Sequence, residues 1–464
     1  MNKQKSLLAL ATVACFIACN SAKEEMENKD IQLITVAPGH FHAALVQKSM
    51  YPDVDSVVHV YAPDGPEVNA HLTLIDQYNG RAENPTSWAE KVYRGDDFLQ
   101  KMLQEKKGNV VVLAGNNQHK IDYITESVNA GLNVLADKPM AINTDGFSKL
   151  QQAFATAAEK GVLLYDIMTE RYEINTMLQK AFSQLPDFFG GLVPGSADHP
   201  AITKESVHHF FKEVSGKPLS RPAWFYDTGQ QGEGIVDVTT HLVDLVQWES
   251  FPDQLINYEE DIQLIGSKRW TTPVTPEQFE RSTGLTEFPA FLSEAVDEEG
   301  NLAVYANGEI NYVLKGIHAK VSVIWNFEAP AGAGDLHYSI MRGKYANLIV
   351  QQGAEEQYKP VLYIESTGER DSQAFEAELA RAVDTLRATY AGLKSERVAE
   401  GRYRISVDPS LVTTHEDHFA QVTEKYLGFL KTGAMPEWEV PNMLAKYYLT
   451  TKALAEAETV ARLE

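Results

Sequence analysis

The chain has 464 residues, 64 acidic against 41 basic side chains, and a formal net charge of −23. A field of this sign and size repels phosphate backbones, so nucleic acid is excluded from the expected partners. With 44% hydrophobic residues the chain can build a substantial core, and its length indicates two domains or one large composite.

The N-terminus has the pattern of an export signal. Lys3 and Lys5 precede an apolar run, residues 7–18, that is shorter than the roughly 20 apolar residues needed to span a bilayer. The four residues ending at Cys19 resemble a bacterial lipobox, which predicts a signal peptide over residues 1–19 and acylation of Cys19. An ordinary signal peptide that contains a cysteine by chance is the alternative.

The next segment, residues 20–30, is charged and has no apolar periodicity, which predicts a flexible tether. Its acidic start resembles the surface-export signal of Bacteroidetes lipoproteins, although a solvated spacer fits equally well. The chain has only two cysteines, Cys15 and Cys19, so after cleavage the body has no disulfide and depends on its core. We therefore expect a cell-envelope protein anchored to the lipid bilayer, either periplasmic or on the cell surface.

Buried strands and helices alternate along residues 31–165. Strands are predicted at residues 31–36, 57–61, 109–114, 133–136 and 162–167. Helices are predicted at residues 43–50, 97–107, 120–130 and 147–160. This alternation predicts parallel βαβ units in a doubly wound sheet, the arrangement of a Rossmann-type dinucleotide-binding domain.

The pattern changes beyond residue 165. Alternating apolar runs at turn-punctuated intervals between residues 301 and 351 predict a mostly antiparallel sheet. Helices are expected at residues 177–182, 236–249, 373–393, 418–431 and 443–463. Residues 166–464 are thus predicted to form an α+β substrate and oligomerisation domain, with the last helices packing back across the body.

The turn after the first strand is where a dinucleotide fold binds pyrophosphate. The glycine positions of G-x-G-x-x-G fall on Ala37, Gly39 and His42, with His40 and Phe41 between the last two. Only the middle glycine is present, and it is the one whose missing side chain lets the pyrophosphate approach. The motif alone is a weak signal.

The ribose contact is also incomplete. An acidic residue is expected at the end of the second strand, where the chain has Ala62, and Asp64 follows two residues later. The choice between NAD and NADP therefore stays open.

Lys138 and Pro139 follow a buried strand of the predicted parallel sheet. Ligands of such sheets bind outside the carboxyl ends of the strands. A lysine there can hold a hydroxyl oxygen and stabilise the negative charge that develops as its proton leaves. The alternative is a surface lysine before a proline turn.

A glycine-rich stretch leads to Asp237, His241 and Asp244. Asp237 and His241 are four residues apart and share one face of a helix, which Asp244 adjoins. An imidazole beside a carboxylate can act as a general base near neutral pH. A histidine paired in the core is one alternative. A metal site is another, but it would need a further ligand that no spacing demands, so no metal is predicted.

Together these motifs resemble the Gfo/Idh/MocA family, the glucose–fructose oxidoreductase and inositol dehydrogenase type, over nearly the whole mature chain. The matching segments are residues 39–43, Asn117 and His119, residues 137–139, Arg171 with Tyr172, and residues 232–241. The long C-terminal part resembles the oxidoreductase C-terminal extension of some Bacteroidetes proteins.

The resemblance implies a role for each motif. NAD or NADP would be held by the first turn, Asp64, Asn117, His119, and residues 138–139. His241 would take a proton from a sugar hydroxyl, Asp237 would orient or share it, and Lys138 would hold the reacting oxygen. The hydride chemistry would belong to the cofactor.

Three further residues are candidates for substrate contact. Tyr226 could stack on a sugar face, with core packing as its alternative, and Asp244 adjoins the catalytic face. Arg171 either supports the substrate pocket or pairs with a carboxylate. The expected partners are a carbohydrate or polyol substrate and, from the resemblance, a second copy of the chain.

Three functions fit these residues. The first is an NAD(P)-dependent oxidoreductase acting on a sugar, glycoside or cyclitol hydroxyl. The second is a redox-neutral enzyme that oxidises a sugar transiently, cleaves the glycoside and reduces the product again, which suits an exported protein because the cofactor is regenerated in each turnover. The third is a family member that binds glycans without turnover, which the eroded glycine turn favours and the set Lys138, Asp237 and His241 opposes.

Overall fold

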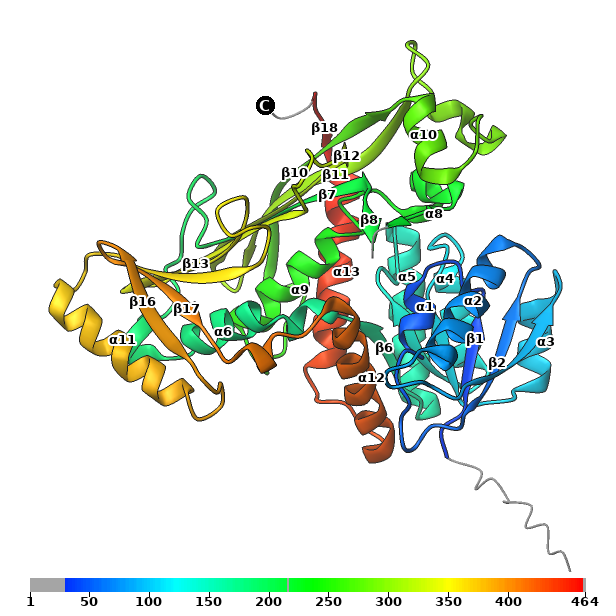
Figure 1. The fold of residues 1–464 in the computed structure, drawn as a ribbon, viewed down its shortest axis with the longest axis horizontal. Helices are drawn as coiled ribbons and strands as arrows, with labels where there is room; N and C mark the ends of the chain where they lie inside the picture. Colours follow the sequence, from blue (N-terminus) through cyan, green and yellow to red (C-terminus); the bar gives the residue numbers. More distant parts are fainter. Residues whose placement is uncertain (1–29, 215–216, 462–464) are drawn as a thin grey trace, which may run out of the picture.

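The computed structural model describes residues 30–214 and 217–461 (Figure 1). The predicted signal peptide, the acylated Cys19 and all of the tether except Asp30 lie outside the described residues. In the part of the chain that is described, no helix is both long and apolar enough to cross a membrane.

The N-terminal domain is built on a parallel six-stranded sheet with the strand order β3-β2-β1-β4-β5-β6. Its strands are β1 (Leu33–Val36), β2 (Val57–Ala62), β3 (Ala89–Arg94), β4 (Val110–Leu113), β5 (Asn133–Asp137) and β6 (Leu164–Ile167). The central strands β1 and β4 are buried along their whole length because helices cover both faces. The predicted doubly wound parallel sheet is confirmed.

The helices of this domain are α1 (His42–Leu45), α2 (Pro66–Gly80), α3 (Phe98–Glu105), α4 (Lys120–Asn129) and α5 (Thr144–Lys160). The helix expected at residues 43–50 is wrong in length, since α1 has only four residues. The Tyr51 hydroxyl donates to the Val46 carbonyl, 3.0 Å away, and helps the chain to turn there.

Strand β3 and helix α2 were not predicted. β3 is a largely exposed edge strand with the charged sequence AEKVYR, so it lacks the apolar run that signals a buried strand. α2 is mostly polar, and its buried positions are few. Their secondary structure therefore depends more on contacts with adjacent elements of the domain than on an apolar pattern of their own.

The second domain contains a mixed ten-stranded sheet ordered β16-β17-β15-β14-β13-β7-β12-β11-β10-β18. The pairs β7–β12 and β10–β18 are parallel, and the other pairs in this sheet are antiparallel, which confirms the predicted mostly antiparallel sheet. The strands are β7 (Ile202–Phe211), β10 (Ile262–Val274), β11 (Leu302–Leu314), β12 (Ile317–Glu328), β13 (Leu336–Arg342), β14 (Ala346–Gln352), β15 (Val361–Ser366), β16 (Lys394–Ala399), β17 (Arg402–Ser406) and β18 (Glu458–Thr459).

The helical segments of this part lie against that sheet or between the domains. They are η1 (Thr169–Tyr172), α6 (Ile174–Ser183), α7 (Pro186–Phe189), η2 (Ala223–Tyr226), α8 (Thr228–Gln231), α9 (Thr239–Ser250), α10 (Pro276–Thr283), η3 (Ala290–Ala295), α11 (Ser372–Leu386), η4 (Pro409–Leu411), α12 (His415–Thr432) and α13 (Glu439–Glu456). A separate short hairpin pairs β8 (Glu213–Val214) with β9 (Lys217–Pro218).

Helices α12 and α13 return to the N-terminal domain from the far end of the chain. Figure 1 shows α12 beside that domain and α13 running from it to the ten-stranded sheet. Phe419, Tyr426, Met443 and Tyr447 belong to the same hydrophobic core as the strands of the parallel sheet. The core of the N-terminal domain is therefore completed by residues from the C-terminal end of the described chain.

Candidate active site

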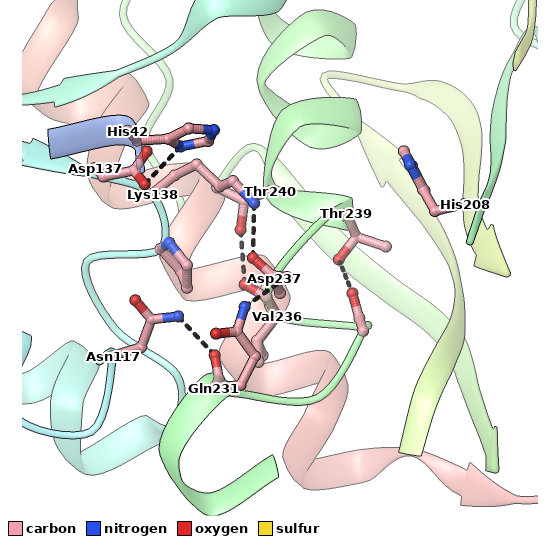
Figure 2. Close-up of polar contacts among 12 residues, drawn as sticks. His42, Asn117, Asp137, Lys138, His208, Gln231, Val236, Asp237, Thr239 and Thr240 are labelled. Carbon is pink, nitrogen blue, oxygen red and sulfur yellow. Dashed lines mark hydrogen bonds and ion pairs between the residues drawn. The ribbon is translucent and has the colours of Figure 1, made fainter. Parts of the chain in front are cut away.

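The two domains meet at the carboxyl ends of β1, β4 and β5, where Lys138 contacts Asp237. The Lys138 Nζ lies 2.6 Å from Asp237 Oδ1, and Gln231 Nε2 donates to the other carboxylate oxygen at 3.0 Å (Figure 2). The two side chains are only 12% and 8% exposed. The folded chain thus brings together two predicted catalytic residues that are 99 positions apart.

The glycines before Asp237 have a packing function. A Cβ on Gly234 would lie 1.8 Å from the carbonyl oxygen of Ala306 in β11, so no other residue fits there. Because the glycines have no side chains, the backbone before Asp237 packs directly against the ten-stranded sheet. This packing fixes the position of Asp237 just before α9.

His241 lies in the first turn of α9, and its Nδ1 has no hydrogen-bond partner among the described residues. Burial, and next the charge of Lys138, hold the pKa of His241 well below its usual value. The imidazole is therefore neutral at pH 7 and can accept a proton.

A buried lysine that was not predicted, Lys120, holds the turn after β5 in place. Lys120 Nζ donates to Asn117 Oδ1 at 2.5 Å, to the Asp137 carbonyl at 2.9 Å and to the Pro139 carbonyl at 3.3 Å. Burial lowers the pKa of Lys120 to about 8. Asn117, a predicted site residue, also donates through Nδ2 to the Gln231 carbonyl at 2.7 Å and so ties the two domains together.

The turn after β1 keeps glycine-like geometry without two of the glycines. Ala37 has φ 44°, the left-handed conformation that glycine adopts most readily. His42 stands at the third glycine position, and its Nδ1 lies 2.9 Å from Asp137 Oδ2 at the end of β5. The backbone N–H groups of Gly39 and His40 both donate to the Ala114 carbonyl at 3.1 and 3.2 Å.

The residues of this edge fit a dinucleotide. A Cβ on Gly39 would lie 3.4 Å from both Gly115 Cα and the Trp224 ring, so the missing side chain lets the turn pack closely against these neighbours. The bare Cα also lets a pyrophosphate approach the backbone of the turn. Phe41, in the same turn, is exposed.

At the ribose end, Asp64 is 75% exposed just beyond β2 and lies 2.7 Å from the guanidinium of Arg94. A carboxylate suits the ribose hydroxyls and a guanidinium suits a 2′-phosphate, so both cofactor types retain a partner here. His119 is exposed at the N-terminal end of α4, and its ring is tilted against that of Tyr123 with the centroids 6.3 Å apart.

Three residues assigned to the substrate have other contacts. Arg171 is buried and holds Asp244 through two bonds of 2.6 and 2.7 Å, and Lys446 adds a third contact to Asp244 at 2.7 Å. Tyr226 is 1% exposed, and its hydroxyl donates to Ser282 at 2.6 Å. These contacts agree with the alternatives given for two of them, a carboxylate partner for Arg171 and core packing for Tyr226, and Asp244 is likewise buried and paired.

Other residues at this junction escaped the sequence analysis. His415, at the start of α12, has its Nδ1 3.6 Å from Glu170 Oε1. Desolvation raises the pKa of Glu170 against the opposing charges of His208 and Lys138, which places all three in one neighbourhood. Figure 2 shows His208 on the strand across from Asp237. The capping box at Thr414 could have predicted where α12 begins, but no local signal brings His415 to Lys138.

Comparisons with known proteins bear on both domains. The family "Oxidoreductase family, NAD-binding Rossmann fold" matches residues 57–166, and the family "Putative oxidoreductase C terminal domain" matches residues 178–458. A crystal structure of a putative oxidoreductase from Parabacteroides merdae is 54% identical, with a TM-score of 0.91, over 92% of this chain and 97% of that chain. No match is found among curated proteins.

More distant structures share the fold. A 3-ketoreductase from Actinomadura kijaniata, in complex with NADP and TDP-benzene, is 12% identical with a TM-score of 0.54 over 93% of this chain and 99% of that chain. A biliverdin reductase from Synechocystis, in complex with biliverdin and NADP+, is 12% identical with a TM-score of 0.54 over 92% and 99%. At this identity the likeness extends to the fold alone.

Proposed function

Because the chain belongs to the Gfo/Idh/MocA family of oxidoreductases with an NAD-binding Rossmann fold, we propose that it acts on a CH–OH group of a sugar, glycoside or cyclitol with NAD or NADP. The observation that carries the proposal is the ion pair of Lys138 with Asp237 beside the neutral imidazole of His241. This group lies outside the strand ends, where sheets of this type bind their ligands.

Each residue of the group has one task. Lys138 binds the reacting oxygen and stabilises negative charge on it. His241 accepts the hydroxyl proton, for which its neutral state prepares it. Asp237 is held by Gln231 and orients the Lys138 ammonium. Hydride acceptance is supplied by the nicotinamide when NAD or NADP is bound.

Nucleotide content tests this proposal. Protein purified in the folded state is denatured, and the released nucleotide is identified by mass and absorbance. We expect NAD or NADP to be retained or to bind on addition, and a Lys138→Ala/His241→Ala variant to lose turnover. If neither nucleotide is retained or bound, the oxidoreductase proposal fails and a glycan-binding function remains.

A second candidate is redox-neutral glycoside cleavage, which Glu170 favours. The Glu170 carboxyl is 38% exposed and lies 3.6 Å from the His415 imidazole; partial burial raises its pKa, so it can donate a proton to a leaving group. The discriminating measurement is made on an aryl glycoside. Release of the aglycone without net NAD(P)H formation, lost in Glu170→Gln, supports cleavage, whereas NAD(P)H formation matching substrate consumption supports net oxidation.

We also propose a lipid anchor at Cys19 in the cell envelope, supported by the lipobox-like sequence and the lack of other cysteines in the mature chain. Metabolic labelling with a tritiated fatty acid tests it. The wild-type chain should take up label and partition into detergent, and Cys19→Ser should do neither. Equal labelling of both would exclude this site.

For the assembly, we propose that two copies pair through the ten-stranded sheet, whose strands β10 and β13 expose Ile265 and Leu336. Light scattering should give the mass of a dimer, and Ile265→Lys/Leu336→Lys should give that of a monomer. A monomeric wild-type chain would contradict this.

A further inference from the structure

We propose that His40, His42 and Asp137 form a binding site for a divalent transition-metal ion, with Zn2+ the first choice on chemical grounds. Each side chain offers one ligand atom, and all these atoms lie within 4.8 Å of one another. The histidines come from the turn after β1, and the carboxylate comes from the end of β5.

The spacing of the donors is close to that of a metal shell. With bonds of about 2.1 Å, neighbouring ligand atoms lie roughly 3 to 3.4 Å apart. The His42 and Asp137 donors are already 2.9 Å apart, and the His40 donor lies within 4.8 Å of both. The His40 ring therefore has to move closer when an ion binds.

The donor chemistry selects the kind of ion. Two imidazoles with one carboxylate suit zinc, iron and their neighbours, whereas magnesium and calcium prefer oxygen ligands. Three protein ligands leave a position open, as in catalytic rather than structural zinc sites. The His415 ring lies 5.9 Å from that of His42, so a fourth donor is close by.

The two lysines near the proposed metal site already have partners of their own. Lys138 is paired with Asp237, and Lys120 donates to Asn117 and to backbone carbonyls. A hydrogen bond between His42 and Asp137 without any ion is the competing account. That account leaves the other histidine unexplained, since His40 gains only a 3.3 Å contact from the backbone N–H of His42.

Metal titration of the full chain, purified without a polyhistidine tag and stripped with chelator, tests the proposal. Calorimetry with ZnCl2 should give one ion per chain, and Co2+ should produce a visible d–d absorption band. His40→Ala and His42→Ala should each weaken binding by about tenfold to a hundredfold or more. The control His199→Ala, an exposed histidine in a loop, should bind as the wild-type chain does.

Wild-type protein without saturable Zn2+ binding would overturn the proposal, and so would variants that bind as tightly as the wild-type chain. Circular dichroism checks that each variant is folded. If a variant is not folded, the test rests on the wild-type chain, whose Tm must rise with Zn2+ concentration if binding is specific. Nucleotide content is measured separately, so failure of the proposed function leaves this readout unchanged.

Discussion

At the scale of single residues, the site depends on side chains whose partners lie far away in sequence. Lys138 is held by Asp237, His42 by Asp137 and Asn117 by Lys120. Each contact is short and shielded from water, so each charge acts at greater strength than it would on the surface. Changing one partner should alter the chemistry more than the fold.

Asp237→Asn should lower kcat/KM by a factor on the order of 10² to 10⁴, because an amide cannot orient the Lys138 ammonium as a carboxylate does. The rate of NAD(P)H formation on the best substrate from a panel of glycosides and cyclitols checks this. Asp261→Asn is the matched control, since Asp261 pairs with Lys315 at 3.3 Å on a partly exposed surface. An unchanged kcat/KM in Asp237→Asn would remove this residue from the mechanism.

His71→Leu should stabilise the protein by about 1 to 2 kcal/mol, because both ring nitrogens are buried without partners among the described residues. Burial lowers the pKa of His71 to about 4, against about 6.5 in an unfolded chain. Between these pH values the unfolded chain binds more protons, so acid destabilises the wild-type protein.

Urea unfolding at pH 7 and pH 5 checks this prediction. The wild-type chain should lose more stability at pH 5 than His71→Leu does. Equal losses in the two proteins would show that folding does not lower the pKa of His71, and would contradict the prediction.

At the scale of elements, a buried ionic network joins helices from distant parts of the chain. Arg171 in η1 binds Asp244 in α9 and Glu439 in α13, while Lys446 in α13 binds Asp244 and, at 2.8 Å, Asp166. Arg171 and Lys446 together outweigh burial and hold the pKa of Asp244 below its usual range. The network places α13 against both domains.

Arg171→Met should destabilise the protein by about 3 to 5 kcal/mol, because it leaves buried carboxylates without a partner. The double variant Arg171→Met/Asp244→Leu should lose less than the sum of the single changes, since it removes the uncompensated charge as well. Chemical denaturation of the four proteins gives the coupling. Strict additivity would mean that the two residues act independently.

At the scale of the molecule, the N-terminal domain is not a continuous stretch of chain. Phe419, Tyr426, Met443 and Tyr447 fill its core from α12 and α13. The same helices bring His415 beside His42 and Glu170. The packing of α12 and α13 against the N-terminal domain therefore both completes its core and assembles the site.

A fragment of residues 30–172 should not fold by itself, because it lacks the side chains of α12 and α13 that cover its sheet. Near-ultraviolet circular dichroism and amide dispersion in NMR check this. A fragment with native tertiary signals would show that the two helices are dispensable for the domain.

Local patterns in the sequence determined the strand–helix alternation of the N-terminal domain and the motifs around Lys138, Asp237 and His241. These features can be predicted from short segments because hydrophobic periodicity and glycine spacing are patterns that extend over only a few residues. The exposed edge strand β3 and the polar helix α2 had no such signal, since their neighbours specify them.

Only the tertiary structure decided which polar residues face the site. Arg171, Tyr226 and Asp244 look like substrate ligands in the sequence, yet they are buried with partners of their own. His415 and Glu170 look unremarkable, yet they adjoin the site. The physical reason is that a side chain's role depends on what surrounds it, and those neighbours come from elements between 56 and 268 residues away in the chain.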